Sequence, residues 1–286
     1  MSLLLGGDLL FAIDFEYAGE KLSDYGFIIC NFNGSGLETV SSGADVIFNQ
    51  VKPAQSNYFF SEISASYEQP FISQPFQICK NPCLVDDDNN FEVTPIEVSA
   101  IQRWLCRKNS FNKFKIIQEG YENIFWNAKF TCQQIMIGGR IVGLELTMYT
   151  DAPFGYMDAI EITENCIANS SFDVYDISDE DGYTYPDMTI TLNDSGHFIL
   201  YNNFNGEEIF RMSLLGCSSG EVITINGKNK IITSSNSDTS HTILARDFNY
   251  DFPKIANFYD CNKNTITTSL DCEIFLSYNP TIKVGL

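Results

Sequence analysis

Basic side chains and histidine are scarce in this sequence. It has 17 lysines and arginines against 37 aspartates and glutamates, a formal net charge of −20, and only two histidines, His197 and His241. Binding to a phosphate backbone needs clustered Lys and Arg, so this balance argues against a nucleic-acid-binding protein. Histidine is the usual base beside a catalytic nucleophile. Both histidines lie in polar, turn-like sequence, and we expect neither to be catalytic.

Long apolar runs are also absent. No stretch reaches the roughly 18 uninterrupted apolar residues that suggest a membrane-spanning helix. The opening residues, MSLLLGGDLL, lack the basic leader and the apolar length of a secretory signal. The sequence signals neither export nor membrane insertion, and we expect the protein to leave a cell only by lysis or within an assembled particle.

The nine cysteines do not form a pattern that suggests disulfides or metal binding. Their number is odd, and most have apolar neighbours, as free buried thiols do. Only Cys79 and Cys83 are close together, as C-x3-C, and no second Cys or His pair lies nearby. A structural zinc site needs such a pair. We therefore expect Cys79 and Cys83 to be small core residues of a protein from a reducing compartment.

The chain length and a break in the strand pattern predict two domains. The chain has 286 residues, whereas domains cluster near about 100–150 residues. The strand-like alternation at 141–149 stops at the proline and glycine of Thr150-Asp151-Ala152-Pro153-Phe154-Gly155-Tyr156, and a new series of strands begins later. We predict domains at residues 1–152 and 153–286.

Strand signals dominate both halves of the chain, as short runs of β-branched and aromatic residues between Gly, Asn, Asp and Pro. Gly138-Gly139 marks one turn between strands, and Asn226-Gly227 predicts a two-residue hairpin. The predicted fold is mainly β, with turn spacing in the second half typical of a sandwich or jelly roll. Examples of predicted strands are 27–32, 45–50, 125–133, 141–149, 189–192, 197–202, 209–215, 222–225, 230–233 and 273–277.

One helix is predicted within the β pattern. Thr94-Pro95-Ile96-Glu97 combines a capping Thr, Pro at the first helical position and Glu three residues after the cap. Apolar residues then recur at helical spacing, which predicts a helix over about 95–109 that covers a sheet of the first domain. These apolar residues are Val98, Ile101, Trp104 and Leu105.

A possible calcium loop precedes this helix. Asp86, Asp88, Asn90 and Glu97 imitate positions one, three, five and twelve of such a loop. Position six is Phe91, where the sharp turn needs Gly, and Glu97 already has a capping role. We expect an acidic turn and assign no metal site.

Sequence alone does not select a catalytic carboxylate pair. Glycoside hydrolysis needs two carboxylates facing each other across a cleft, and 37 acidic residues give no basis for choosing two. The acidic stretch 173–187, which includes Asp176, is expected to be a solvated loop. Trp104 and Trp126 are plausible core positions rather than a sugar-stacking pair. We assign no catalytic, cofactor-binding or metal-binding residue.

The order of these features resembles a known family. A strand-forming N-terminal segment, one amphipathic helix with Trp104-Leu105 and a run of strands are followed by Ala152-Pro153-Phe154-Gly155-Tyr156. Over nearly the whole chain, this order is similar to that of the phage distal tail protein (Dit) family. The matching segments of the second half are Tyr185-Pro186-Asp187-Met188-Thr189-Ile190, then Ile199, Tyr201 and Asn202, and then Gly220-Glu221-Val222-Ile223-Thr224-Ile225-Asn226-Gly227.

The resemblance implies an architecture and a set of partners. It implies that residues 1–152 form a β-sandwich-like ring domain, six copies of which enclose a channel, and that 153–286 form a galectin-like β-sandwich (jelly roll). The implied partners are the tail tube, the tail-associated hub or lysin protein, and receptor-binding or baseplate proteins. Carboxylates lining the channel would let DNA pass without sticking. The implied location is the tail tip of the virion, after assembly in the host cytoplasm.

We therefore predict a structural, non-enzymatic component of a phage tail tip, without a cofactor. One alternative is a carbohydrate-binding adhesion protein of the same tail, because a galectin-like fold does not fix function. Against it, the second half contains no Trp to stack on a sugar. The other alternative is a cell-wall polysaccharide hydrolase with an unrecognised carboxylate pair.

Overall fold

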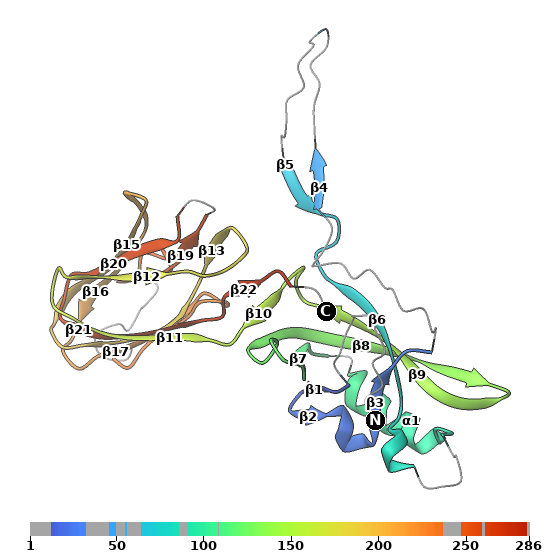
Figure 1. Cartoon of the computed structure of the whole chain (residues 1–286). Helices are drawn as coiled ribbons and strands as arrows, with labels where there is room; N and C mark the ends of the chain where they lie inside the picture. The colour runs from blue at the N-terminus through green and yellow to red at the C-terminus, as the bar shows by residue number, and fades with distance from the viewer. Residues whose placement is uncertain are drawn as a thin grey trace. The chain divides into compact units, whose positions relative to one another are not determined.

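Figure 1 shows the fold, taken from a computed structural model. It describes residues 13–32, 46–49, 55, 64–85, 91–107, 109–236, 247–258 and 261–284. The chain divides into two compact units, the first comprising Met1–Met157 and Ile282–Leu286 and the second Asp158–Thr281. The end of the chain therefore belongs with the first unit.

The first unit is built around one large antiparallel sheet. Its strand order is β2-β1-β7-β8-β9-β6-β3, with β10 paired to β8 and to β22, while β4 and β5 pair with each other in a separate small sheet. The elements are β1 (Phe15–Tyr17), β2 (Glu20–Lys21), the 3-10 helix η1 (Leu22–Tyr25), β3 (Phe27–Cys30), β4 (Val46–Asn49), β5 (Ser64–Tyr67), β6 (Ser73–Lys80), the 3-10 helix η2 (Pro82–Leu84), α1 (Pro95–Leu105), β7 (Asn112–Ile116), β8 (Ile124–Ile137), β9 (Arg140–Thr150), β10 (Gly155–Met157) and, at the end of the chain, β22 (Thr281–Ile282).

Helix α1 packs against this sheet through the predicted stripe, which is fully buried. The capping box is formed: the Glu97 N–H donates to the Thr94 hydroxyl at 3.3 Å, and the Thr94 N–H donates to the Glu97 carboxylate at 2.7 Å. Trp104 stacks on Phe15 of β1, with ring centroids 5.6 Å apart. The helix ends at Leu105 rather than near 109, because the next stripe positions, 108 and 109, carry polar Lys and Asn.

The β8–β9 hairpin has the turn that its sequence predicts. Gly138 and Gly139, at φ +58° and +82°, are the only residues between β8 and β9. Positive φ at both central residues gives a turn whose twist matches that of the strands. The hairpin is long: β8 pairs with β9 from Ala128 to Ile137, whereas its pairing with β7 ends at Ala128.

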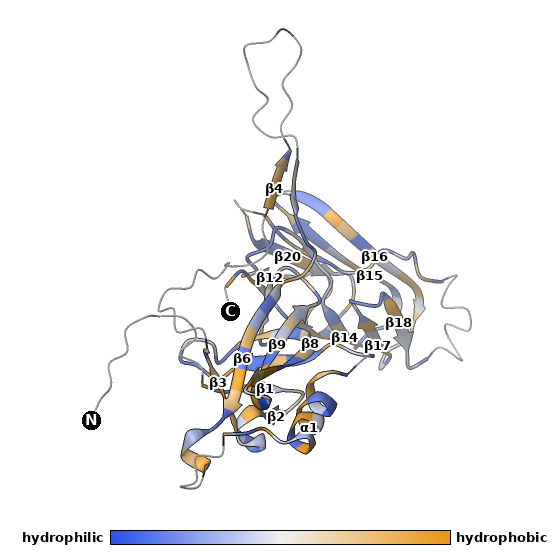
Figure 2. Cartoon of the chain, turned by 90° about the vertical axis from the view of Figure 1, so that its right-hand side faces the viewer, coloured by the Kyte–Doolittle hydropathy of each residue, from blue (hydrophilic) through white to orange (hydrophobic). Residues whose placement is uncertain are grey.

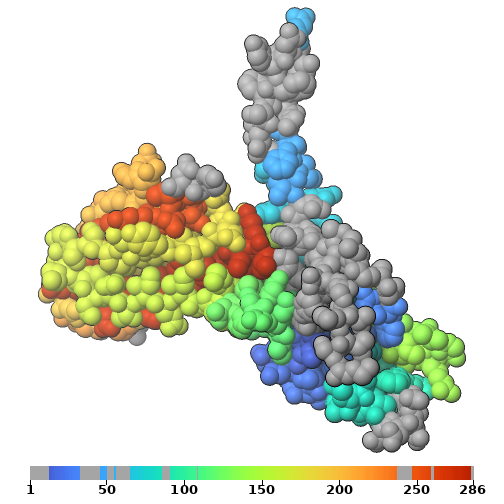
Figure 3. Space-filling model, in the orientation of Figure 1, coloured from blue at the N-terminus to red at the C-terminus, as the bar shows by residue number. Residues whose placement is uncertain are grey.

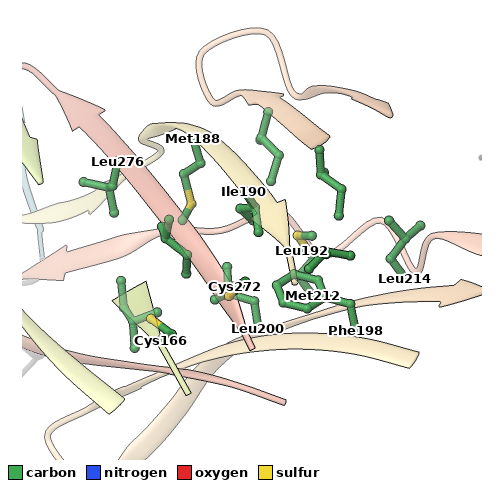
Figure 4. Close-up of a cluster of buried hydrophobic side chains, with 14 of the residues drawn as sticks. Cys166, Met188, Ile190, Leu192, Phe198, Leu200, Met212, Leu214, Cys272 and Leu276 are labelled. Carbon is green, nitrogen blue, oxygen red and sulfur yellow. The ribbon is translucent and has the colours of Figure 1, made fainter. Parts of the chain in front are cut away.

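The second unit is a sandwich of two antiparallel sheets, as predicted. One sheet has the order β11-β21-β14-β17-β18 and the other β12-β20-β15-β16, while β13 and β19 pair with each other outside these two sheets. Alternate residues of their strands turn inward and form one apolar core (Figure 4). The strands are β11 (Ile160–Cys166), β12 (Ser171–Tyr175), β13 (Gly182–Thr184), β14 (Asp187–Leu192), β15 (Gly196–Phe204), β16 (Glu207–Cys217), β17 (Val222–Asn226), β18 (Ile231–Ser234), β19 (Ile255–Asn257), β20 (Lys263–Thr268) and β21 (Cys272–Tyr278).

The connection between β17 and β18 differs from the predicted two-residue hairpin. Asn226 pairs with Ile231, so residues 227–230 form the loop. The Asn229 N–H donates to the Asn226 side chain at 2.9 Å, and Lys230 adopts the left-handed conformation at φ +52°. Glycine is needed at 227 for another reason: a Cβ there would lie 2.1 Å from the carbonyl oxygen of Tyr185. Close approach of two backbones, not hairpin geometry, explains this glycine.

The acidic stretch 173–187 is not a solvated loop throughout, so that prediction was wrong. It contains parts of β12 and β14 and all of β13, and Asp176 is buried. The N–H and the hydroxyl of Ser178 donate to the Asp176 carboxylate at 3.0 and 2.7 Å. Both bonds go to the Oδ1 oxygen, whereas the buried Oδ2 oxygen has no hydrogen-bond partner among the described residues, so Ser178 offsets only part of the cost of burying this acid.

Candidate assembly interface

The β4–β5 hairpin exposes apolar side chains at consecutive positions. Val46, Ile47 and Phe48 of β4 are all exposed, Phe48 by 62%, and Figure 2 shows the hydrophobic colour of this strand. β4 pairs with β5 over Val46–Asn49 and lies outside the large sheet. A two-stranded hairpin is marginally stable alone in water. An exposed apolar hairpin of this kind is typical of an element that packs on another protein surface.

The tip of the β8–β9 hairpin is a second exposed apolar feature. Met136 and Ile137 are 56% and 64% exposed, and the tip stands at the surface of the first unit, in light green in Figure 3. The same hairpin leaves part of a strand edge open. β7 pairs with β8 only at Trp126, Asn127 and Ala128, and β8 continues to Ile137.

A groove of about 800 Å³ lies along this open part of β8. It combines apolar walls with three basic side chains, Arg103 in the last turn of α1, Arg107 just after the helix and Lys129 on β8. Phe111 contributes its ring, which lies under the Lys129 ammonium at 4.4 Å. The full lining is Ser99, Gln102, Arg103, Cys106, Arg107, Phe111, Lys129, Phe130, Thr131, Cys132 and Tyr149.

The basic groove was not anticipated from the sequence. Arg103 and Arg107 are four positions apart, so a helix that continued one turn would place them on one face, and this spacing was the available signal. The net charge of −20 gives no sign of a local cluster of cations. Lys129 joins them only through the pairing of β8 with its neighbours, which sequence spacing does not reveal.

His197 shows no catalytic arrangement among the described residues. His197 is exposed on β15, with Nε2 2.6 Å from the Ser213 hydroxyl oxygen. Within the described part of the chain, no carboxylate hydrogen-bonds to the other ring nitrogen, so the third member of a catalytic triad is missing. His241 lies outside the described residues.

The described residues form no metal site. Asp86, Asp88 and Asn90 of the calcium-like pattern lie outside the described residues, while Glu97 serves the helix cap and forms an ion pair with Lys80 at 3.0 Å. Over the described ranges, no group of three or more His, Cys, Asp or Glu side chains could hold a metal ion.

The cysteines are all free thiols. Cys79 is half-buried on β6, where its side chain contacts Cys30 of β3. Cys83 is exposed in η2, so the prediction that both members of the C-x3-C pair are core residues was wrong for Cys83. The cause is the short 3-10 turn at Pro82–Leu84, which has no buried residue.

The tryptophans and acids give no support for a sugar-cleaving cleft. Trp104 and Trp126 are both buried in the first core. A smaller pocket of about 430 Å³ contains Glu16, Glu119 and Glu122. Backbone N–H groups of Glu122 itself and Gly120 lower the pKa of Glu122, which is opposite to the raised pKa that a general acid requires. Among the described helices, none is long and apolar enough to cross a membrane.

Two family models match the chain in tandem. A phage tail protein N-terminal domain matches residues 11–152, and a phage tail C-terminal domain matches residues 154–278. No curated protein matches the sequence significantly.

A solved phage structure has a similar fold. The Dit protein (gp 19.1) of phage SPP1, described as a paradigm of the hub adsorption apparatus in phages that infect Gram-positive bacteria, is 10% identical, with a TM-score of 0.65 over 93% of this chain and 98% of that one. A chain of the phage P2 baseplate, in its activated conformation with Ca, is 9% identical, with a TM-score of 0.45 over 92% of this chain and 97% of that one.

Proposed function

Since the chain belongs to the phage tail protein family, we propose that it is a hub component of the tail tip that assembles into a hexameric ring. The observation that carries this proposal is the tandem match of an N-terminal and a C-terminal phage tail domain over residues 11–152 and 154–278. The shared fold with the SPP1 Dit protein, at a TM-score of 0.65, supports it. The role is structural, and the chain acts without a cofactor.

The exposed features of the first unit are suited to ring closure. A head-to-tail interface uses two different surfaces of each copy, and closure leaves neither exposed. The β4–β5 hairpin, with its exposed Phe48, supplies one such surface. Strand edges supply another, because their unpaired N–H and C=O groups can be satisfied by a neighbouring copy.

The two domains take different roles in this proposal. The first unit forms the ring, and the second unit, Asp158–Thr281, forms a galectin-like sandwich. The tail tube contacts one face of the ring, the hub or lysin protein the other, and receptor-binding or baseplate proteins the periphery. The acidic excess of 37 over 17 residues lines the channel in part, so that DNA passes through without binding. Assembly takes place in the host cytoplasm, and the ring ends in the virion.

Mass measurement and electron microscopy of the purified full chain test the ring. We expect a species of six times the 32.2 kDa chain mass, and class averages with six-fold symmetry around an open pore. Phe48→Asp should reduce assembly strongly, while Ile167→Asp, at another exposed apolar residue in the second unit, should leave it unchanged. A chain that stays single at every concentration, and with its neighbours from the tail present, would refute the ring.

Glycan binding by the second unit is the second candidate function. The exposed rings of Tyr183 and Phe258 pack edge to face at 5.8 Å, and the Lys254 ammonium lies 4.7 Å from the Tyr183 ring. Exposed rings beside a polar group suit stacking on a sugar. Binding on a glycan array that Tyr183→Ala abolishes would support this function, and no binding by the assembled wild type would reject it.

A further inference from the structure

The open edge of β8 has the geometry of a vacant strand position. In the sheet, β7 lies on one side of β8 and β9 on the other. β9 pairs with β8 from Ala128 to Ile137, but β7 pairs with it only at Trp126–Ala128. Beyond Ala128, no described strand occupies the β7 side.

Two hydrogen bonds establish which backbone groups face the vacant side. The Ala128 carbonyl accepts from the Tyr17 hydroxyl at 3.2 Å, on the β7 side, while the Asn127 carbonyl accepts from the Asp151 N–H at 3.1 Å, on the other. Backbone groups of an antiparallel strand alternate between its two edges. The N–H and C=O groups of Phe130, Cys132 and Gln134 therefore face the open side, and no described strand pairs with them there.

The groove lies where the missing strand would be. Side chains of successive strand residues point to opposite faces of a sheet, and the groove is lined by Lys129 and Thr131 as well as by Phe130 and Cys132. It therefore wraps around the strand edge instead of lying on one face. Gln102 of α1 reaches the Cys132 side chain and closes one wall.

The charge of the groove is opposite to that of the chain. Arg103 and Arg107 are exposed and form no ion pair with any described carboxylate, and Lys129 adds a third cation. The whole chain, in contrast, carries −20. Cations concentrated along a strand edge favour an incoming strand that carries carboxylates.

We propose that an extended, carboxylate-bearing segment of a second copy of this chain adds as a strand to the open edge of β8. Main-chain hydrogen bonds to Phe130, Cys132 and Gln134 would supply affinity, and the cations would supply selectivity. The acidic excess makes a second copy the favoured occupant, and the exposed Met136 and Ile137 extend the contact along the same hairpin. The inference rests on the proposed assembly and assigns one of its contact surfaces.

Hydrogen exchange of the full chain tests the strand addition directly. On assembly, the amides of Phe130, Cys132 and Gln134 should exchange at least about tenfold more slowly, because new backbone hydrogen bonds protect them. The amides of Thr131 and Gln133, which face β9, serve as internal controls and should be protected both in the single chain and in the assembly. An assembly in which the first three amides exchange as fast as in the single chain would overturn the proposal.

Charge reversal and cross-linking identify the occupant. The variant R103E/R107E should weaken assembly at least about tenfold, whereas K228E/K230E, with the same charge change in the second unit, should have little effect. In a mixture of ¹⁴N- and ¹⁵N-labelled chains, a carbodiimide should link Lys129 to a carboxylate of the other isotope. Links within one copy alone, or none, would exclude the second copy as occupant. If no assembly forms, the proposed ring fails as well. If a ring forms without protection of β8, only the strand addition fails.

Discussion

Replacing Leu105 by alanine should destabilise the first unit by about 3–5 kcal/mol. Leu105 is 0% exposed, at the last position of α1. Leucine-to-alanine changes in cores cost about 2–5 kcal/mol, and the cost is highest where neighbours do not collapse into the cavity. Here the preceding residue, Trp104, is held between Tyr25 and Phe15 by stacking, with ring centroids 4.5 and 5.6 Å apart. Such interlocked rings leave the cavity open, so the upper part of the range applies.

Tryptophan fluorescence measures this change in the first unit alone. Trp104 and Trp126 both belong to the first core, and the second unit has no tryptophan. A denaturant titration of the full chain therefore gives the free energy of unfolding of the first unit, whatever the second unit does. Ile96→Ala is the matched control, because Ile96 lies on the same helix but is 81% exposed. Its effect should stay within about 0.5 kcal/mol.

The free energies of unfolding of Leu105→Ala and Ile96→Ala are compared to test whether the apolar stripe of α1 faces the sheet. A loss of less than about 1 kcal/mol for Leu105→Ala, or a loss equal to that of Ile96→Ala, would show that the stripe of α1 does not face the sheet. The denaturant slope should stay constant across the series, because a changed slope would indicate that the unit no longer unfolds in one step.

Three further predictions concern other parts of the chain. Burial alone would raise the pKa of Glu97, but hydrogen bonds from Thr94 and Lys80 lower this pKa below its ordinary value. The stability that the carboxylate contributes should therefore be complete above the ordinary pKa and be lost as the pH falls through the lower pKa of the folded state. Glu97→Gln should remove this part of the acid transition in a pH titration of unfolding. Burial raises the pKa of Cys272 to about 12, so mass spectrometry after iodoacetamide treatment at pH 8 should find the exposed Cys83 modified in the native protein and Cys272 only after unfolding. Ile282→Asp should destabilise the unit that holds the tryptophans by about 1–3 kcal/mol in the fluorescence assay, because Ile282 packs against the first core.

Local features were predictable from the sequence because their causes are local. The capping box at Thr94 and Glu97 and the turn at Gly138-Gly139 each depend on a few adjacent residues, and both are present in the structure. The buried stripe of α1 was predictable for the same reason, since helical spacing alone defines it. Strands such as β9 and β15 were predictable from the alternation of their side chains, whereas β6, β7, β11, β12 and β20 were not among the predicted strands.

Features that depend on distant contacts were not predictable. The turn glycine at 227 is needed because the backbone of Tyr185 passes close to it. Asp176 looks like a surface residue in its acidic stretch, and its burial follows from where the fold places that segment. Periodicity reports whether a residue tends to be buried, but it does not reveal which distant segment covers it.

The open edge of β8 is the strongest example, because it is defined by a strand that ends early. β7 reaches β8 only as far as Ala128, and nothing in the sequence of β8 records where its neighbour stops. Charged residues, lysine above all, often protect such edges from pairing with other chains. That protection works when the approaching chain has the same charge, and copies of this chain carry −20. Cations along this edge therefore attract other copies of this acidic chain. A residue type that prevents strand pairing in a basic protein would here promote assembly.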